Sequence, residues 1–194
     1  MTATFQHLTH EKLSTRALTR DRIRTITYWL FTVLLVWELA AGSLWNLLQI
    51  EWIRAQLNHI GYPLYFAYIL GVWEVGGAAA IIAPGFPRLK EWAYAGSFFN
   101  FSGAVVSHLL TGDFAPVSVW VTPLVFAMFV VVSWGLRPAE RRLPNAGLAP
   151  ETRPRAWAVS IGILVVLYVV SYLTLPAVNV ALHRRALDLG WIAR

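Results

Sequence analysis

The feature that most constrains this chain is a series of long apolar segments separated by short polar ones. Runs of about 18 or more apolar residues, long enough to cross a bilayer, occupy residues 25–48, 64–83, 92–111, 116–136 and 157–175. Inside lipid the backbone has no water to bond with, and runs of this length satisfy their own polar groups as helices. The sequence therefore predicts an all-α integral membrane helical bundle with five transmembrane helices.

The composition agrees with a membrane environment. Of the 194 residues, 57% are hydrophobic and 13% are charged, and the mean hydropathy is +0.55, which is too apolar for an ordinary soluble domain. The formal net charge of +6 does not indicate nucleic acid, because the basic residues lie between the apolar segments and not on one surface. We expect the lipid bilayer to be a partner and nucleic acid not to be one.

The sequence contains no cysteine. This excludes disulfides, thiol relays and iron–sulfur ligation. A bis-histidine haem is not expected either, because His108 alone among the five histidines lies in an apolar segment. The sequence requires no cofactor, so a redox role needs a group supplied from outside the chain.

The basic residues predict the orientation. Five of the 16 Lys and Arg residues lie in residues 1–24, two in residues 88–90 and five in residues 137–155. These segments fall on one side of a five-helix arrangement, and the positive-inside rule places that side in the cytoplasm. The N-terminus is therefore expected in the cytoplasm and the C-terminus across the membrane.

The predicted organisation has four parts. Residues 1–24 form a basic cytoplasmic tail, residues 25–136 a four-helix membrane core, residues 137–156 a Pro-rich cytoplasmic linker, and residues 157–194 a fifth transmembrane helix with a C-terminal tail. Between the first two spans, residues 50–63 alternate apolar and polar residues at helical spacing. This pattern favours a short helix that lies on the outer surface or caps the bundle.

Two acidic residues, Glu38 and Glu74, lie near the middle of the first two spans. A carboxylate at this depth costs about 2.5 to 3.5 kcal/mol, so such residues normally face the bundle interior or a wet cavity. In the third span Asn100 and His108 share one polar stripe with two serines. We predict that Asn100 meets the glutamates at mid-membrane depth, and that His108 lies closer to the outer end.

These residues define a candidate pocket, with Trp37, Trp73 and Tyr94 as candidate walls. Two interpretations of the polar groups remain open. They either bind a ligand, substrate or proton, or they only form hydrogen bonds that fix helix packing. No spacing of Glu, Asp and His residues supports a metal site.

Glu91 has a different role in this scheme. It stands at the cytoplasmic start of the third span, where a carboxylate interacts favourably with the positive end of the helix dipole. Its neighbours Arg88 and Lys90 are the expected charge partners. We interpret these three residues as structural or capping residues.

A series of short motifs runs through residues 25–136. They are Tyr28-Trp29, Glu38, Gly61-Tyr62-Pro63, Gly71-Val72-Trp73, Pro84-Gly85, residues 87–96, and Ser107-His108 with Gly112-Asp113. In order and spacing they resemble the DoxX-like family of small bacterial membrane proteins. The resemblance implies a four-helix bundle in a bacterial inner membrane, with the C-terminal tail then periplasmic. Where the family often has Lys after Gly-Val-Trp, this chain has Glu74.

The family's name comes from a small subunit of thiosulfate:quinone oxidoreductase, so the resemblance implies a link to quinone or redox metabolism. Our leading hypothesis is an accessory membrane protein, not an enzyme on its own, whose pocket binds a lipophilic molecule such as a quinone beside a membrane or peripheral redox partner. One alternative is a non-catalytic scaffold or chaperone-like partner of another protein. The other is an intramembrane acid–base isomerase that uses the glutamates.

Overall fold

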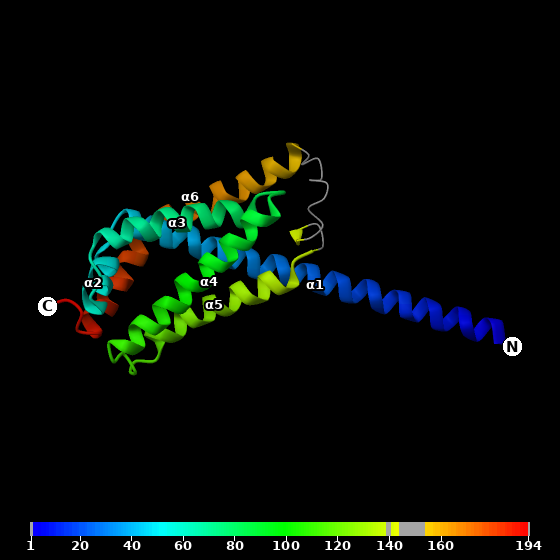
Figure 1. The fold of residues 1–194 in the computed structure, drawn as a ribbon, viewed down its shortest axis with the longest axis horizontal. Helices are drawn as coiled ribbons and strands as arrows, with labels where there is room; N and C mark the ends of the chain where they lie inside the picture. The colour runs from blue at the N-terminus through cyan, green and yellow to red at the C-terminus, as the bar shows by residue number, and fades with distance from the viewer. Residues whose placement is uncertain (1, 139–140, 144–153, 194) are drawn as a thin grey trace.

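The described part of the chain folds as six α-helices, of which five form a bundle and one lies across its end. The computed structural model describes the backbone of residues 2–138, 141–143 and 154–193, and the side chains of these ranges from residue 18 onwards. Within them it contains no strand, and the helices are α1 (Thr2–Leu47), α2 (Glu51–Ile60), α3 (Tyr65–Ile82), α4 (Pro87–Leu110), α5 (Ser118–Leu136) and α6 (Pro154–Asp188) (Figure 1). The all-α prediction is confirmed.

Proline and glycine set the helix ends. α3 ends at Ile82, two residues before Pro84, because a residue preceding proline is pushed away from the helical conformation. α4 begins at Pro87, where the missing N–H of proline has no helical partner to lose. α2 ends at Ile60 and is capped by Gly61, whose φ of 81° is accessible to glycine at little cost.

Among the residues that the structure describes, four helices are long and apolar enough to cross a membrane: residues 18–47 of α1, and α3, α5 and α6. The 24-residue α4 is also long enough to cross, but it does not belong to this apolar set, because serine, asparagine and histidine residues interrupt it. It packs against α3 and α5 with one of its faces. The face of α4 that carries Tyr94, Ser97 and His108 is buried against these neighbours, whereas Trp92, Phe99 and Leu110 on its other side are exposed.

The main core lies around α1, which contacts α3, α5 and α6. Leu35 and Leu39 of α1 pack with Ile81 of α3, all three almost fully buried. Side chains of α6, the helix predicted as an addition to a four-helix core, pack on this cluster; they are Ile163, Leu164 and Leu167. α6 is thus an integral part of the bundle.

A close contact between α1 and α3 depends on Gly71. A Cβ atom added there would lie 2.7 Å from Cγ of Leu47 and 3.2 Å from the carbonyl oxygen of Ser43. Small residues at helix interfaces allow this approach in membrane proteins. The spacing between α1 and α3, which determines how polar groups on the two helices meet, therefore depends on this glycine.

The short helix expected between the first two spans is α2, and it closes one end of the bundle. Ile53 and Leu57 of α2 are buried with Ala67 of α3, and Leu175 and Leu182 of α6 pack on them. α6 therefore runs the length of the bundle and finishes at the end that α2 covers (Figure 1). At the opposite end α1 continues beyond the other helices as far as Thr2.

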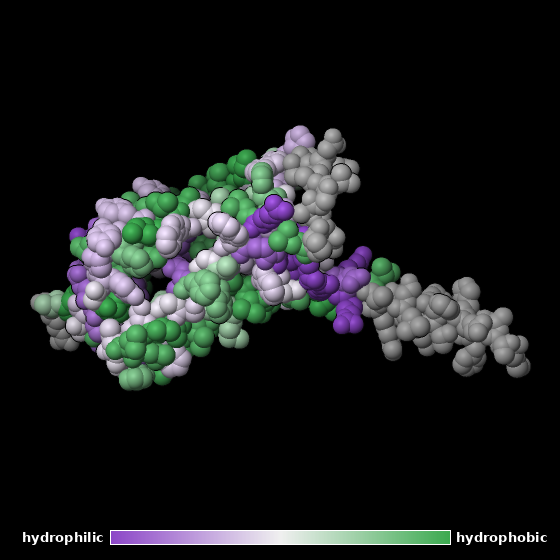
Figure 2. Space-filling model, in the orientation of Figure 1, coloured by the Kyte–Doolittle hydropathy of each residue, from purple (hydrophilic) through white to green (hydrophobic). Residues whose placement is uncertain are grey.

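On the face shown in Figure 2, apolar residues cover much of the bundle, and hydrophilic residues gather where α1 leaves it and, to a smaller extent, at the end where α2 lies. Exposed apolar side chains occur on α3, α5 and α6; examples are Val72, Val131, Val166 and Leu173. In water such a surface would be costly, whereas lipid tails are as apolar as these side chains. Both features agree with a bundle embedded in a membrane.

Candidate functional site

The centre of the candidate site is the carboxyl group of Glu74, on α3. Glu74 is only 9% exposed to solvent. Asn46 of α1 donates a hydrogen bond from Nδ2 to Oε2 at 2.9 Å, and Asn100 of α4 donates from Nδ2 to Oε1 at 3.2 Å. One carboxyl group thus ties three helices together.

Gly42 makes room for this carboxyl group on the α1 side. A Cβ atom at position 42 would lie 3.1 Å from Oε2 of Glu74 and 3.3 Å from its Oε1, closer than such atoms ordinarily approach. The absence of a side chain therefore lets Glu74 reach the surface of α1, where Asn46 binds it.

Glu38 has a different environment from Glu74. It lies on α1 one helical turn before Gly42 and two turns before Asn46, so the three residues share a face. Glu38 is half-buried and, within the described residues, forms no hydrogen bond, although it lies within electrostatic reach of Glu74. Both carboxyl oxygens of Glu74 accept hydrogen bonds, whereas those of Glu38 accept none within the described residues.

The structure brings together Glu74 and Asn100, as the polar stripe of the third span predicts, and adds Asn46. Asn46 was missed by the sequence analysis, which considered only the charged residue of the first span. Its spacing of eight residues from Glu38 and four from Gly42 is the signal that would have found it, because residues so spaced lie on one helix face.

The proposed aromatic walls do not enclose this site. Trp37 and Trp73 are 46% and 69% exposed, so their indoles lie on the outer surface of the bundle. Tyr94 is buried, but its hydroxyl lies 2.8 Å from Oγ of Ser133, which in turn lies 2.7 Å from Oγ1 of Thr32. Tyr94 therefore belongs to a separate hydroxyl cluster between α1, α4 and α5.

His108 belongs to a third polar cluster, at the end of the bundle covered by α2. The ring is fully buried, with Nδ1 2.7 Å from Oδ2 of Asp113 and Nε2 3.0 Å from the side-chain nitrogen of Gln56. His59 lies 2.8 Å from the other oxygen of Asp113. Trp191, after α6, stacks on both histidine rings, so this cluster joins α2, the α4–α5 loop and the C-terminal segment.

Asp113 is the electrostatic centre of the His108 cluster. Burial acts to raise the pKa of Asp113, but the hydrogen bonds with His108 and His59 outweigh it and hold the pKa below its usual value. The ionised carboxylate is therefore the form that this arrangement favours.

Glu91 does not pair with the neighbours expected from the sequence. Its carboxylate binds Nη1 of Arg137 at 2.8 Å and accepts a hydrogen bond from the indole of Trp134 at 2.8 Å. Burial acts to raise the pKa of Glu91, and these two partners lower it to a value below the usual one. The pairing with Arg88 and Lys90 is thus corrected: contacts from α5, distant in sequence, replace those from adjacent residues.

Lys90 instead caps the end of α3. Its buried ammonium group donates hydrogen bonds to the carbonyl oxygens of Ala80, Ile81 and Ala83. Arg141 also donates to the carbonyl of Ile81. A helix C-terminus carries unpaired carbonyl groups and a partial negative charge. Lys90 and Arg141 donate hydrogen bonds to these carbonyl groups and bring positive charge to the same end of α3. Arg88 is exposed.

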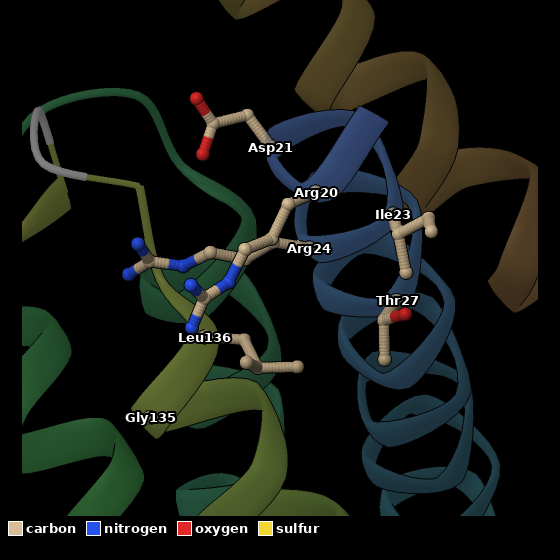
Figure 3. Close-up of a pocket in the computed structure, with 7 residues that line it drawn as sticks. All are labelled: Arg20, Asp21, Ile23, Arg24, Thr27, Gly135 and Leu136. Carbon is tan, nitrogen blue, oxygen red and sulfur yellow. The ribbon is translucent and has the colours of Figure 1, made fainter. Parts of the chain in front are cut away.

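No group of three or more His, Asp or Glu side chains in the described part of the chain is arranged to hold a metal ion. A cavity of about 910 Å³ does exist, but at the end of the bundle where α1 leaves it, between α1 and α5 (Figure 3). It does not include Glu38, Glu74 or Asn100.

Comparison with known proteins identifies the family. The sequence model of the DoxX-like family matches residues 30–133, more than half of the chain. The chain belongs to the DoxX-like family. The matched region of this DoxX-like protein contains Glu38, Asn46, Glu74 and Asn100, and it ends before α6. No curated protein and no solved structure matches the chain.

Proposed function

We propose that this DoxX-like membrane protein binds a lipophilic molecule with a polar head group, with a quinone or quinol as the leading candidate. The observation that carries the proposal is the contrast between two neighbouring carboxyl groups. Glu74 is held by Asn46 and Asn100, whereas Glu38 has no hydrogen bond within the described residues. A carboxyl group at membrane depth is costly unless it has a partner, and a ligand would supply one to Glu38.

The chemistry of Glu38 suits a quinone-type head group in either redox state. An ionised carboxylate accepts a hydrogen bond from a quinol hydroxyl, and a protonated one donates to a quinone carbonyl. Glu38 is half-buried, so a molecule dissolved in the bilayer can reach it from the side of the bundle. Trp37, the residue before Glu38 on α1, is exposed, so its indole can contact a lipophilic tail.

In this proposal the protein is an accessory component of quinone or redox metabolism and acts beside a membrane or peripheral redox partner. No cysteine is available to carry electrons, so electron transfer belongs to the quinone and its partner enzymes. We place the protein in a bacterial inner membrane, as the resemblance to DoxX-like proteins implies. Its N-terminus lies in the cytoplasm in this proposal, because twelve of the 16 basic residues fall on that side.

The test is a titration of decylubiquinone into the full-length protein in nanodiscs, followed by tryptophan fluorescence. The proposal predicts saturable binding that Glu38→Leu weakens at least tenfold while the melting temperature stays within a few degrees. The control is Glu51→Gln, which changes a half-buried carboxylate of α2 that lies outside the site and pairs with His183 of α6. Equal affinity in Glu38→Leu and the wild type, or no saturable binding to the wild type, would contradict the proposal.

A second candidate, a scaffold for another protein, is favoured by the length of α1. This helix has 46 residues, more than twice the number that a bilayer core requires, and its N-terminal part stands clear of the bundle (Figure 1). Pull-down from native membranes separates the two functions. A stoichiometric partner lost on deletion of residues 2–17 supports the scaffold, and an unchanged set of partners contradicts it.

A further inference from the structure

We infer that the cavity between α1 and α5 is a binding site for the phosphate of an anionic phospholipid. Its lining residues are Arg20, Asp21, Ile23, Arg24, Thr27, Gly135 and Leu136. Figure 3 shows the side chains of Arg20 and Arg24 extending from α1 toward the end of α5. This site is separate from the glutamates and does not depend on the function proposed for them.

The charges of the cavity suit one phosphate. Two guanidinium groups outnumber the single carboxylate of Asp21, so the cavity carries a net positive charge. Within the described residues Arg20 forms no ion pair or hydrogen bond, and the only bond of the Arg24 guanidinium is a long one, 3.3 Å from Nη2 to the carbonyl oxygen of Arg137. Guanidinium groups with N–H donors to spare bind phosphate oxygens in a planar, two-pronged geometry.

The depth of the cavity favours a lipid over a free anion. A bilayer core about 30 Å thick is crossed by roughly 20 helical residues, so counting back from Leu47 places the start of the core near Tyr28. Arg20 and Arg24 then lie about 6 to 12 Å beyond it, at 1.5 Å per residue, which is the level of the head groups. The side chains of Ile23 and Leu136 offer apolar surface to the attached glycerol and acyl chains.

The α5 side of the cavity is held in place by hydrogen bonds from Arg142. Arg142 donates to the carbonyl oxygens of Gly135, at 2.8 Å, and of Arg137, at 2.7 Å, and these bonds complete the end of α5. These bonds from Arg142 hold the end of α5, so the guanidinium of Arg20 is not needed to position this side of the cavity.

Native mass spectrometry of the full-length protein, titrated with phosphatidylglycerol or phosphatidylcholine, tests this inference. We expect the wild type to retain phosphatidylglycerol with at least tenfold higher affinity than phosphatidylcholine. Arg20→Gln together with Arg24→Gln should abolish most of this preference. Arg20→Gln alone, which leaves the bond from Arg24 to Arg137 in place, should reduce it severalfold in a folded protein.

The matched control is Arg88→Gln together with Arg155→Gln, which removes the same charge from exposed positions outside the cavity and should leave the preference unchanged. An equal loss in both double variants would mean diffuse attraction to the basic surface and would overturn the inference. So would displacement of the lipid by millimolar inorganic phosphate, because the site would then recognise a free anion, or equal retention of the two lipids.

Discussion

At the scale of single residues, the two membrane glutamates do different work. Glu74 accepts one hydrogen bond on each carboxyl oxygen, and Gly42 leaves it the space to do so. Glu38, which lies on α1 one helical turn before Gly42, forms no hydrogen bond within the described residues. The interpretation of these groups as packing contacts fits Glu74, and the interpretation as a ligand site fits Glu38.

The bonds to Glu74 predict the effect of removing their donors. Asn46→Leu and Asn100→Leu each leave one oxygen of a buried carboxyl group without a partner, which costs roughly 1–3 kcal/mol. Thermal unfolding in detergent should show both variants destabilised, with Asn46→Leu the more affected because its bond is the shorter. A control is Asn58→Leu, at an exposed position of α2. No loss of stability in either site variant would mean that Glu74 is not held in this way.

At the scale of helices, Gly71 and Gly76 of α3 allow a matched comparison. A methyl group at position 71 would collide with Leu47 and Ser43 of α1, whereas at position 76 it would meet nothing within 4 Å. Gly71→Ala should therefore destabilise the bundle by about 1–3 kcal/mol, the usual cost of overpacking. Gly76→Ala should be neutral or stabilising by up to about 1 kcal/mol, since alanine favours the helix. Equal melting temperatures for the two variants would contradict the close α1–α3 packing.

The contacts around Asp113 predict a dependence of stability on pH. Because the pKa of Asp113 is lowered in the folded protein, its stabilising effect is present above the unfolded pKa of about 4 and is lost as the pH falls through the folded value. Asp113→Asn should lower the melting temperature at pH 7, and the difference from the wild type should shrink as the pH is reduced from about 5 to 3. A difference that stays constant over this range would show that the carboxylate charge is not involved.

At the scale of the whole molecule, most ends of the bundle helices could be predicted from the sequence, but most partners of the polar side chains could not. Apolar runs and flanking proline or glycine place both ends of α3, α4 and α5 to within about five residues. α1 instead begins at Thr2, inside the segment predicted as a tail, and α6 continues past the predicted residue 175 to Asp188. The meeting of Glu74 with Asn100 follows from the helical period. Pairs such as Glu91 with Arg137 join residues far apart in sequence, and no local pattern encodes them.

For the same reason, the sequence could not show that the pocket candidates belong to separate clusters. Helical periodicity gives the face of a residue but not the neighbour that the face meets, so Tyr94 and His108 were grouped with the glutamates although each joins a cluster of its own. Arg185, which the positive-inside rule does not favour on the side away from the cytoplasm, has tertiary contacts there. It donates to Ser118 and lies over Trp52, at the end that α2 covers.

The arrangement of the bundle predicts which segments share a side of the membrane. If all five bundle helices cross it, α2 and the end of α6 lie on one side and the start of α4 on the other. The chain has no cysteine, so single cysteines at Asn58, Asp188 and Arg88 can be labelled in intact cells with an impermeant maleimide. Asn58→Cys and Asp188→Cys should react and Arg88→Cys should not. Reaction at Asp188→Cys on the opposite side from Asn58→Cys would contradict five crossings.

The division of roles between the two glutamates is tested most directly by carboxyl labelling in native membranes. Dicyclohexylcarbodiimide is lipid-soluble and modifies membrane carboxyl groups that it can reach, and peptide mass spectrometry locates the product. This division of roles predicts modification of Glu38, little modification of Glu74, and protection of Glu38 by added decylubiquinone. Modification of Glu74 in preference to Glu38, or of neither residue, would contradict it.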